Sequence, residues 1–267
     1  MVKELEISNN ERQFILKAII EGYRIDNRRK SDFRKLNISF GQEFGKSEVT
    51  LGSTRVLAKV SCQVTRPYQD RPSEGILILN SELSQMAFPN FEIGRPEEVL
   101  VNRILEKAIK RSRAIDTEGL CILAGEKAID IHFIDNDGNI IDAACIAAIS
   151  ALSHFRRPDV TVIGQDVTIK RNPVPLSVHH MPICVTFAFF ENGEHFVVDP
   201  TLQEEQTKSG DMTITLNDHK EIFALSKAGG VALEIETIKY CTKIATTKVN
   251  WLAEQIKLAL EKDNEKR

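Results

Sequence analysis

Helical spacing of apolar positions marks the first element of the chain. Ser8 followed by Glu11 fits a capping box at a helix start, and Gly22 is a stop signal. Between them an apolar stripe recurs at helical spacing, formed by Phe14, Ile15, Ala18 and Ile19. We therefore predict a short amphipathic helix here.

Alternating apolar and polar positions follow. They predict strands at 36–41, 47–52 and 54–64, separated by glycine-containing turns, and a further strand at 74–83. A helix is predicted over 97–115, with its core face formed by Val101, Ile104, Leu105 and Ala108.

The middle of the chain continues with two expected strands, 120–125 and 128–135, and an Asn-Asp-Gly turn signal at 136–138. The segment 140–155 is apolar almost all round and contains several alanines, which predicts a helix buried against a sheet.

The second half of the chain again shows strand patterns followed by a helix pattern. Residues 181–190 are apolar on both faces and predict a central strand. Further strands are expected in HFVVDP, TITLN and EIFALSKAGG, and the chain closes with an amphipathic helix over VNWLAEQIKLALEKDNEKR. Its apolar residues Trp251, Leu252, Ile256 and Leu260 are expected to pack internally, although they could instead dock a partner. With no linker-like segment in between, the pattern favours one α+β or α/β domain.

Composition narrows the class of protein. The chain has 267 residues, 42% of them hydrophobic, and a formal net charge of -3. A chain of this length and hydrophobic content can bury a large core. Because its net charge is slightly negative, any contact with nucleic acid must depend on local clusters of cations. The five cysteines form no C-x-x-C pair and do not cluster with the six histidines, so we expect reduced thiols, no metal site and no cofactor. No signal-peptide core opens the chain and no window approaches the roughly 18 apolar residues of a membrane helix, so no membrane association is expected.

Several sequence blocks resemble the RNase PH family. RIDNRR at 24–29 resembles its R-x-D-G-R motif, with Asn27 where the family has glycine, and GSTRVLAKVSCQV resembles the G-x-T-x-V strand that follows. The longer blocks ELSQMAFPNFEIG, GLCILAGEKA, DNDGNIIDAACIAAISALSHFRRPDV, PVPLSVHHMPICVTFAFF and VVDPTLQEE resemble the non-catalytic ring subunits of the eukaryotic RNA exosome. The resemblance implies an α+β, duplicated β-α-β-α fold (ribosomal protein S5 domain 2-like), as a single domain with halves at roughly 30–160 and 161–267.

The stretch matching the family's phosphate site has changed its chemistry. Active members resemble one another in a D-G-G-T-R run whose hydroxyl and guanidinium hold phosphate at a helix start. Here the run is Asp137 and Gly138 followed by Asn139, Ile140, Ile141 and Asp142. Asp142 is expected to favour the helix dipole and to repel an incoming phosphate. We interpret the run as a helix start with a degenerate phosphate site.

Active members also carry two carboxylates six residues apart, one of them a general acid. Asp199 and Glu205 have that spacing and form a residual acid pair. In a turn rich in Glu, Gln and Lys, the simpler interpretation is a solvated surface. No catalytic residue is therefore expected.

The helix expected at 97–115 is rich in cations. Arg103, Lys107, Lys110 and Arg113 are spaced by four, three and three residues, which predicts a basic ridge on one side, and Arg111 adds to it. A solvated face, or cations paired with a neighbour's acids, is the alternative, and the resemblance favours RNA contact. Arg66 and Arg71, in a loop with Tyr68, are secondary RNA candidates, as are Arg156 and Arg157.

The resemblance implies a non-catalytic core subunit that scaffolds the exosome ring and lines its path for RNA processing, including rRNA processing, and 3′–5′ degradation. The implied partners are an RNase PH-like dimer partner resembling exosome component four, S1/KH cap subunits, the catalytic exoribonuclease and RNA. The implied locations are nucleus, nucleolus and cytoplasm. The alternative is an active phosphate-dependent 3′–5′ exoribonuclease.

Overall fold

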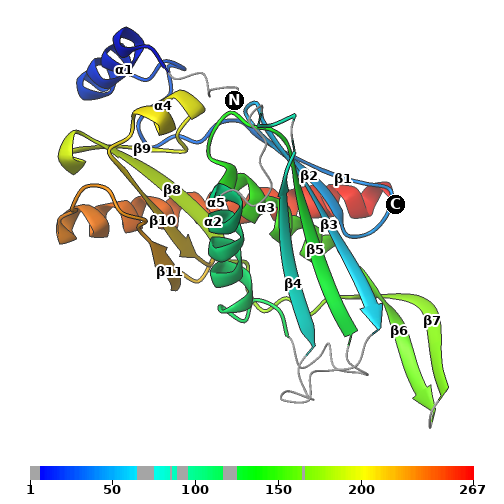
Figure 1. Cartoon of the computed structure of the whole chain (residues 1–267). Coiled ribbons are helices and arrows are strands. Elements are labelled where there is room, and N and C mark those ends of the chain that lie inside the picture. The colour runs from blue at the N-terminus through cyan, green and yellow to red at the C-terminus, as the bar shows by residue number, and fades with distance from the viewer. Residues whose placement is uncertain (1–6, 65–74, 85, 89–95, 117–124, 164–165) are drawn as a thin grey trace.

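The computed structural model describes residues 7–64, 75–84, 86–88, 96–116, 125–163 and 166–267. Two sheets and a separate hairpin make up its β-structure (Figure 1). The predicted α+β, RNase PH-like class is confirmed. The grouping into a single domain of two halves stays a prediction.

The first sheet has the strand order β1-β2-β3-β5-β4. Its strands are β1 (Leu36–Phe40), β2 (Lys46–Leu51), β3 (Thr54–Val64), β4 (Ile76–Leu83) and β5 (Gly125–Asp135). Neighbours run antiparallel except β4 and β5, which pair in parallel. The strands predicted at 36–41, 47–52, 54–64 and 74–83 are confirmed. The break predicted between strands at 120–125 and 128–135 was wrong, because β5 runs without interruption from Gly125, and residues 120–124 lie outside the described residues.

The second sheet has the order β11-β10-β8-β9 and is antiparallel throughout. It comprises β8 (Ile183–Phe190), β9 (His195–Val198), β10 (Gly210–Leu216) and β11 (Ile222–Ser226). Every residue of β8 is buried, in agreement with the central strand predicted from its mostly apolar sequence. Helix α1 (Asn9–Glu21) packs Ile15 and Ile19 against Ala188 and Phe190 of this strand.

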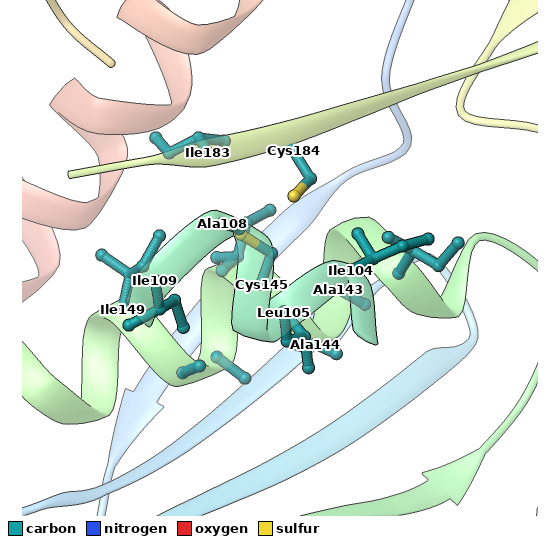
Figure 2. Packing of buried hydrophobic residues seen from close by; sticks show 14 of the residues in the cluster. Ile104, Leu105, Ala108, Ile109, Ala143, Ala144, Cys145, Ile149, Ile183 and Cys184 are labelled. Atoms are coloured by element: carbon teal, nitrogen blue, oxygen red, sulfur yellow. The ribbon is translucent and has the colours of Figure 1, made fainter. Parts of the chain in front are cut away.

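Helix α3 (Ile140–His154) joins the two sheets. It contacts β2 and β3 on one side and β8 on the other, so almost all of its residues are buried. Figure 2 shows Ile104 and Ile109 from the neighbouring α2 region gathered with α3 residues, and Cys184 of β8 pointing toward α3. The helix predicted from the apolar run at 140–155 is confirmed, and its burial on all sides explains its composition.

Helix α5 (Ile235–Lys266) is longer than the predicted terminal helix and packs against β8, β10 and β1. Leu252 and Ile256 are fully buried in the core, and Leu260 is partly buried against it, as expected. Trp251 differs, because 39% of it is exposed.

Two elements were not predicted. One is the hairpin of β6 (Arg156–Ile163) and β7 (Asp166–Pro175), which projects from the body in Figure 1. Both strands of such a two-stranded hairpin have a free edge, where proline is tolerated. The other is the short helix α4 (Leu202–Thr207), which begins at a capping box of Thr201 and Glu204.

The helix expected at 97–115 ends earlier and changes pitch. Helix α2 (Pro96–Leu105) continues as the π-helical turn η1 (Glu106–Lys110), and regular helix ends there. A short 3-10 turn, η2 (Glu191–Gly193), links β8 to β9. No helix in the described part of the chain is both long and apolar enough to cross a membrane.

Candidate functional site

The turn before α3 crosses closely under the chain that leads into α4. Gly138 has φ +84°, and a Cβ there would lie 2.4 Å from the Leu202 nitrogen. The amide of Leu202 donates to the carbonyl of Asp137 at 3.1 Å. This close approach requires glycine, and it brings the start of α3 beside residues 199–205.

Asn139, the N-cap of α3, is the centre of the site. Its side-chain amide donates to Asp142 Oδ2 at 2.9 Å and to Asp199 Oδ1 at 2.6 Å. Its backbone amide donates to Glu205 Oε1 at 2.9 Å. Four residues that the sequence singled out, from two distant segments, are therefore brought together.

Asp142 is fully buried and receives hydrogen bonds from Thr186. The backbone amide of Thr186 donates to Oδ2 at 2.9 Å, and its hydroxyl donates to Oδ1 at 2.8 Å. Burial raises the pKa of Asp142 to about 7. The prediction that Asp142 presents a charge to an incoming anion was wrong, because its carboxyl group points into the protein and binds β8.

Asp199 is also fully buried, so the interpretation of the acid pair as a solvated surface was wrong for it. Arg34 Nη2 donates to its Oδ1 at 2.8 Å, and Arg34 Nε and the backbone amide donate to Oδ2 at 3.0 and 2.8 Å. Arg28 adds a bond to Oδ2 at 2.9 Å. Two guanidinium groups and one amide side chain thus surround a single carboxylate.

Arg24 extends this network to α4. It forms a buried, bidentate ion pair with Glu204, at 2.6 and 2.9 Å, and donates to the carbonyl groups of Val198 and Asp199. We missed the roles of Arg24, Arg28 and Arg34 from the sequence, although two of them lie in the RIDNRR block. Asn27, which replaces the family's glycine there, has φ +60°, a left-handed conformation that asparagine tolerates.

The two isoleucines of the degenerate phosphate site belong to the hydrophobic core. Ile141 is 8% exposed and lies in the main cluster, and the half-buried Ile140 packs against it. Neither side chain can donate a hydrogen bond or carry charge, so the start of α3 gains no anion-binding group from them.

Two further donors near the start of α3, both on Arg34, are directed at protein acceptors. Arg34 Nη1 and Nη2 also donate to the carbonyl groups of Asp137 and Gly138, at 2.8 and 2.9 Å. Glu205 accepts the Asn139 amide, and burial raises the pKa of Glu205 and of Asp137. A carboxylate of the protein therefore lies at the helix N-terminus, where a phosphate would bind.

The cationic segment at the end of α2 differs from the start of α3, because most of its charged side chains are exposed to solvent. Arg103, Lys110, Arg111 and Arg113 are exposed and Lys107 is half-buried, while Val101, Ile104, Leu105 and Ala108 are buried as predicted. The predicted single ridge was wrong, because the π turn changes the spacing after Leu105. Glu106, Lys110, Arg111 and Arg113 instead line one surface depression.

The secondary candidates are only partly described. Arg66 and Arg71 lie outside the described residues. Arg156 is half-buried and donates to the carbonyl groups of Ser153 and Phe155 at 3.2 Å. Arg157 is half-buried as well. Within the described ranges, Cys62, Cys145, Cys184 and Cys241 are free thiols, and no three potential ligands gather as a metal site would require.

Comparisons with known proteins agree with this architecture. Residues 32–158 match domain 1 of the 3′ exoribonuclease family (RNase PH), and residues 180–248 match domain 2. The chain is 47% identical to "Exosome complex component rrp45" of Schizosaccharomyces pombe, covering 100% of this chain and 95% of that one. It is 50% identical to the human "Exosome complex component RRP45", covering 100% of this chain but 63% of that longer protein. The resemblance of the sequence blocks to RNase PH-like ring subunits of the exosome is thereby confirmed.

Comparison with solved structures also finds exosome chains. A chain of the "archaeoglobus fulgidus exosome with RNA bound to the active site" superposes with a TM-score of 0.82 at 29% identity, covering 92% of this chain and 98% of that one. A chain of an "Archaeal exosome core" superposes with a TM-score of 0.80 at 27% identity, covering 93% and 97%. The sequence, the two-sheet fold and these matches agree, and the chain belongs to the 3′ exoribonuclease (RNase PH) family.

Proposed function

We propose that this protein is a non-catalytic core subunit of an RNA exosome, which scaffolds the ring and lines the path of RNA toward 3′–5′ processing and degradation. The observation that carries the proposal is the start of α3. There Asn139 and Arg34 direct their donors at Asp142, Asp199 and neighbouring carbonyl groups, and Glu205 accepts the backbone amide of Asn139.

Phosphorolysis requires inorganic phosphate to be held and aimed at the scissile bond. Phosphate carries about two negative charges and needs cationic or amide donors. At the start of α3 a phosphate would have to displace Glu205 and lie near Asp199. A phosphate that drew Arg28 and Arg34 away from Asp199 would leave this fully buried carboxylate without its cations, which is costly. The family's fold is therefore kept without its phosphate chemistry.

Contact with RNA is supported by the exposed cations at the end of α2. Arg103, Lys110 and Arg111 face solvent, and a flexible single strand binds such surfaces through its phosphates. One superposed structure is described as holding RNA, and we extend RNA contact to this chain on that basis.

The relatives named as exosome complex components support membership of such a complex. As partners within it we propose an RNase PH-like dimer partner resembling exosome component four, S1/KH cap subunits and the catalytic exoribonuclease of the complex. The corresponding locations are nucleus, nucleolus and cytoplasm.

A phosphorolysis assay tests the absence of catalysis. The purified chain, alone and with its dimer partner, is incubated with single-stranded RNA and phosphate, and released nucleoside diphosphates are measured. We expect the chain alone to release none, and Glu205→Gln to leave any activity of the dimer unchanged. Phosphate-dependent release that Glu205→Gln abolishes would establish the alternative, an active exoribonuclease.

The mass of the intact assembly tests the scaffold role. After purification through a tag on this chain, native mass spectrometry is expected to give a complex of different core subunits, each present once. A ring of identical copies of this chain would contradict the proposal.

A further inference from the structure

Strand β1 is an edge strand, and among the strands of the described chain only β2 pairs with it. The amide of Gly41, just after β1, donates to the carbonyl of Lys46 at 3.1 Å. Hydrogen-bonded residues alternate along an antiparallel strand, so the odd-numbered residues of β1 bond to β2. The backbone N–H and C=O groups of Leu36, Ile38 and Phe40 therefore point to the free edge, where another strand can pair with them.

A groove of about 530 Å³ follows this edge, between β1 and the last turns of α5. All five residues of β1 line it. Because consecutive residues of a strand point to opposite faces of its sheet, a groove that contacts all five runs along the strand edge. The α5 residues recur at alternating intervals of three and one, which places them on one face of the helix. They are Gln255, Leu258, Ala259, Lys262, Asp263 and Lys266.

The C-terminal end of α5 is fixed beside the C-terminal end of β1 (Figure 1). Arg267 donates to the carbonyl of Gln42 at 2.8 Å, and its guanidinium lies 4.5 Å from the centre of the Phe44 ring. Asp263 pairs with Arg267 at 2.6 Å, and its Oδ2 lies 3.2 Å from Nε2 of the buried His154. These contacts set the spacing between helix and strand, so the groove is formed before any ligand binds.

The free charge in the groove is positive. Lys262 and Lys266 are exposed, and neither forms an ion pair with another residue that the structure describes. The acidic lining residue, Asp263, is already paired. Leu258 is 46% exposed and supplies an apolar contact farther from the end of the helix. The lining therefore suits a ligand with apolar groups toward one end and carboxylates toward the other.

We propose that this groove binds an extended, acidic segment of a partner protein, which adds a strand to the first sheet beside β1. The backbone of the segment pairs with the free edge, and its side chains contact Leu258, Lys262 and Lys266. In an antiparallel pairing, the more stable arrangement, its carboxylates are at its N-terminal end. The groove lies near His154, at the opposite end of α3 from the degenerate phosphate site, and its ligand requires no contact with RNA.

Amide hydrogen exchange tests the addition of a strand. The probe is a synthetic peptide of about eight residues, an ordinary strand length, with two N-terminal glutamates followed by alternating valine and threonine. In the free protein we expect rapid exchange at Leu36, Ile38 and Phe40 and slow exchange at Asn37 and Ser39. Saturating peptide should slow the three rapid amides about tenfold or more. Unchanged exchange at these amides would overturn the proposal.

Methylation of the peptide backbone distinguishes a strand from a loosely bound chain. Two versions of the peptide carry N-methyl groups on alternate amides, one on the amides that face β1 and the other on those that face away. Because a strand bonds to one neighbour through every second amide, only one version should lose affinity, by about tenfold. Equal losses in both versions, or no loss in either, would contradict strand addition.

Charge reversal tests the acidic character of the ligand. We expect Lys262→Glu/Lys266→Glu to weaken peptide binding about tenfold, and Lys239→Glu/Lys243→Glu, which changes exposed cations elsewhere on α5, to alter it less than about twofold. A peptide with lysines in place of its glutamates should prefer the Lys262→Glu/Lys266→Glu variant to the wild type. Equal effects of the two double variants would show that the groove lysines do not select the ligand.

The measurements are made on the full chain and on the assembled complex. Binding that is lost in the complex would mean that neighbouring subunits cover the groove, and the proposal would fail. An oligouridylate of similar length, added as a competitor, is expected not to displace the peptide, because a nucleic acid cannot pair with the edge of β1. Displacement would assign the lysines to RNA and would also overturn the proposal.

Discussion

The start of α3 and the end of α2 both concentrate charged residues, and they direct that charge to different partners. At the start of α3, the carboxylates of Asp142 and Asp199 are fully buried, and the protein itself supplies their partners. At the end of α2, Arg103, Lys110 and Arg111 are exposed around a surface depression or beside it.

The difference shows how one fold can pair charged groups internally in one region and present them to solvent in another. Buried carboxylates in the first region satisfy the arginines that would otherwise attract an anion. The second region has no such internal counter-charge in its core face, which consists of Ile104, Leu105, Ala108 and Ile109. Charge paired inside the protein stabilises the fold, whereas charge facing solvent is available to a ligand.

Removing the carboxylate of Asp199 should lower the stability of the protein more than any other substitution considered for the two regions. Asp199→Ala leaves Arg28 and Arg34 without their buried counter-charge, so we expect the free energy of unfolding to fall by about 3–5 kcal/mol. Urea denaturation measures it. Arg111→Ala, in the exposed region, is the control, with a change of roughly 0.5 kcal/mol or less. A loss below about 1 kcal/mol for Asp199→Ala would contradict the account.

Two substitutions of Asp142 distinguish the contribution of its hydrogen bonds to stability from the contribution of its charge. In Asp142→Asn the new carbonyl can accept from Asn139 and Thr186, and the new amide can donate to the Thr186 hydroxyl. Asp142→Ala removes these acceptors and leaves a buried amide unpaired. At pH 6 we expect Asp142→Ala to cost about 2–3 kcal/mol, and Asp142→Asn less than about 1 kcal/mol. Equal losses in urea denaturation would show that the charge, and not the hydrogen bonding, matters.

The pH dependence of stability tests the same residue independently. The folded pKa of Asp142, about 7, is higher than its value of 3.8 without burial, so the folded state binds the proton more tightly. This contribution is therefore full below about pH 4 and is lost as the pH rises to 7. We expect Asp142→Asn to gain roughly 2 kcal/mol of stability relative to wild type between pH 5 and 7. A constant difference across this range would be inconsistent with a raised pKa.

The exposed cations should give the smallest effect on stability. Lys110→Gln/Arg111→Gln/Arg113→Gln is expected to change the free energy of unfolding by about 0.5 kcal/mol or less, because surface charges contribute little. A loss above about 2 kcal/mol, measured by urea denaturation, would mean that these cations hold the fold together and would remove the contrast between the two regions.

Local patterns predicted much of the fold. The capping box of Ser8 and Glu11 starts α1, Gly22 ends it in a left-handed conformation, and the apolar run at 140–155 forms the buried α3. The failures arise where distant contacts decide the structure. The π turn is fixed by the packing of Ile109 and Ala114, which the periodicity of a regular helix does not indicate.

Part of the candidate site's membership was predicted, but its three arginines and its chemistry were not. Asn139, Asp142, Asp199 and Glu205 do converge, but the burial of Asp199 depends on Arg34, which is 165 residues away in sequence. The local composition around residues 199–205 is polar and indicated solvent exposure. Only the tertiary fold, which brings the segment 24–34 against this turn, pairs the carboxylate.

Phosphate titration followed by backbone amide NMR tests the central claim most directly. The account predicts that the amide resonances of residues 139–142 do not move as phosphate rises to about 10 mM, because Glu205 already accepts the Asn139 amide. Saturable shifts at these amides, with a submillimolar dissociation constant, would show that an anion displaces Glu205 and would contradict a silent site.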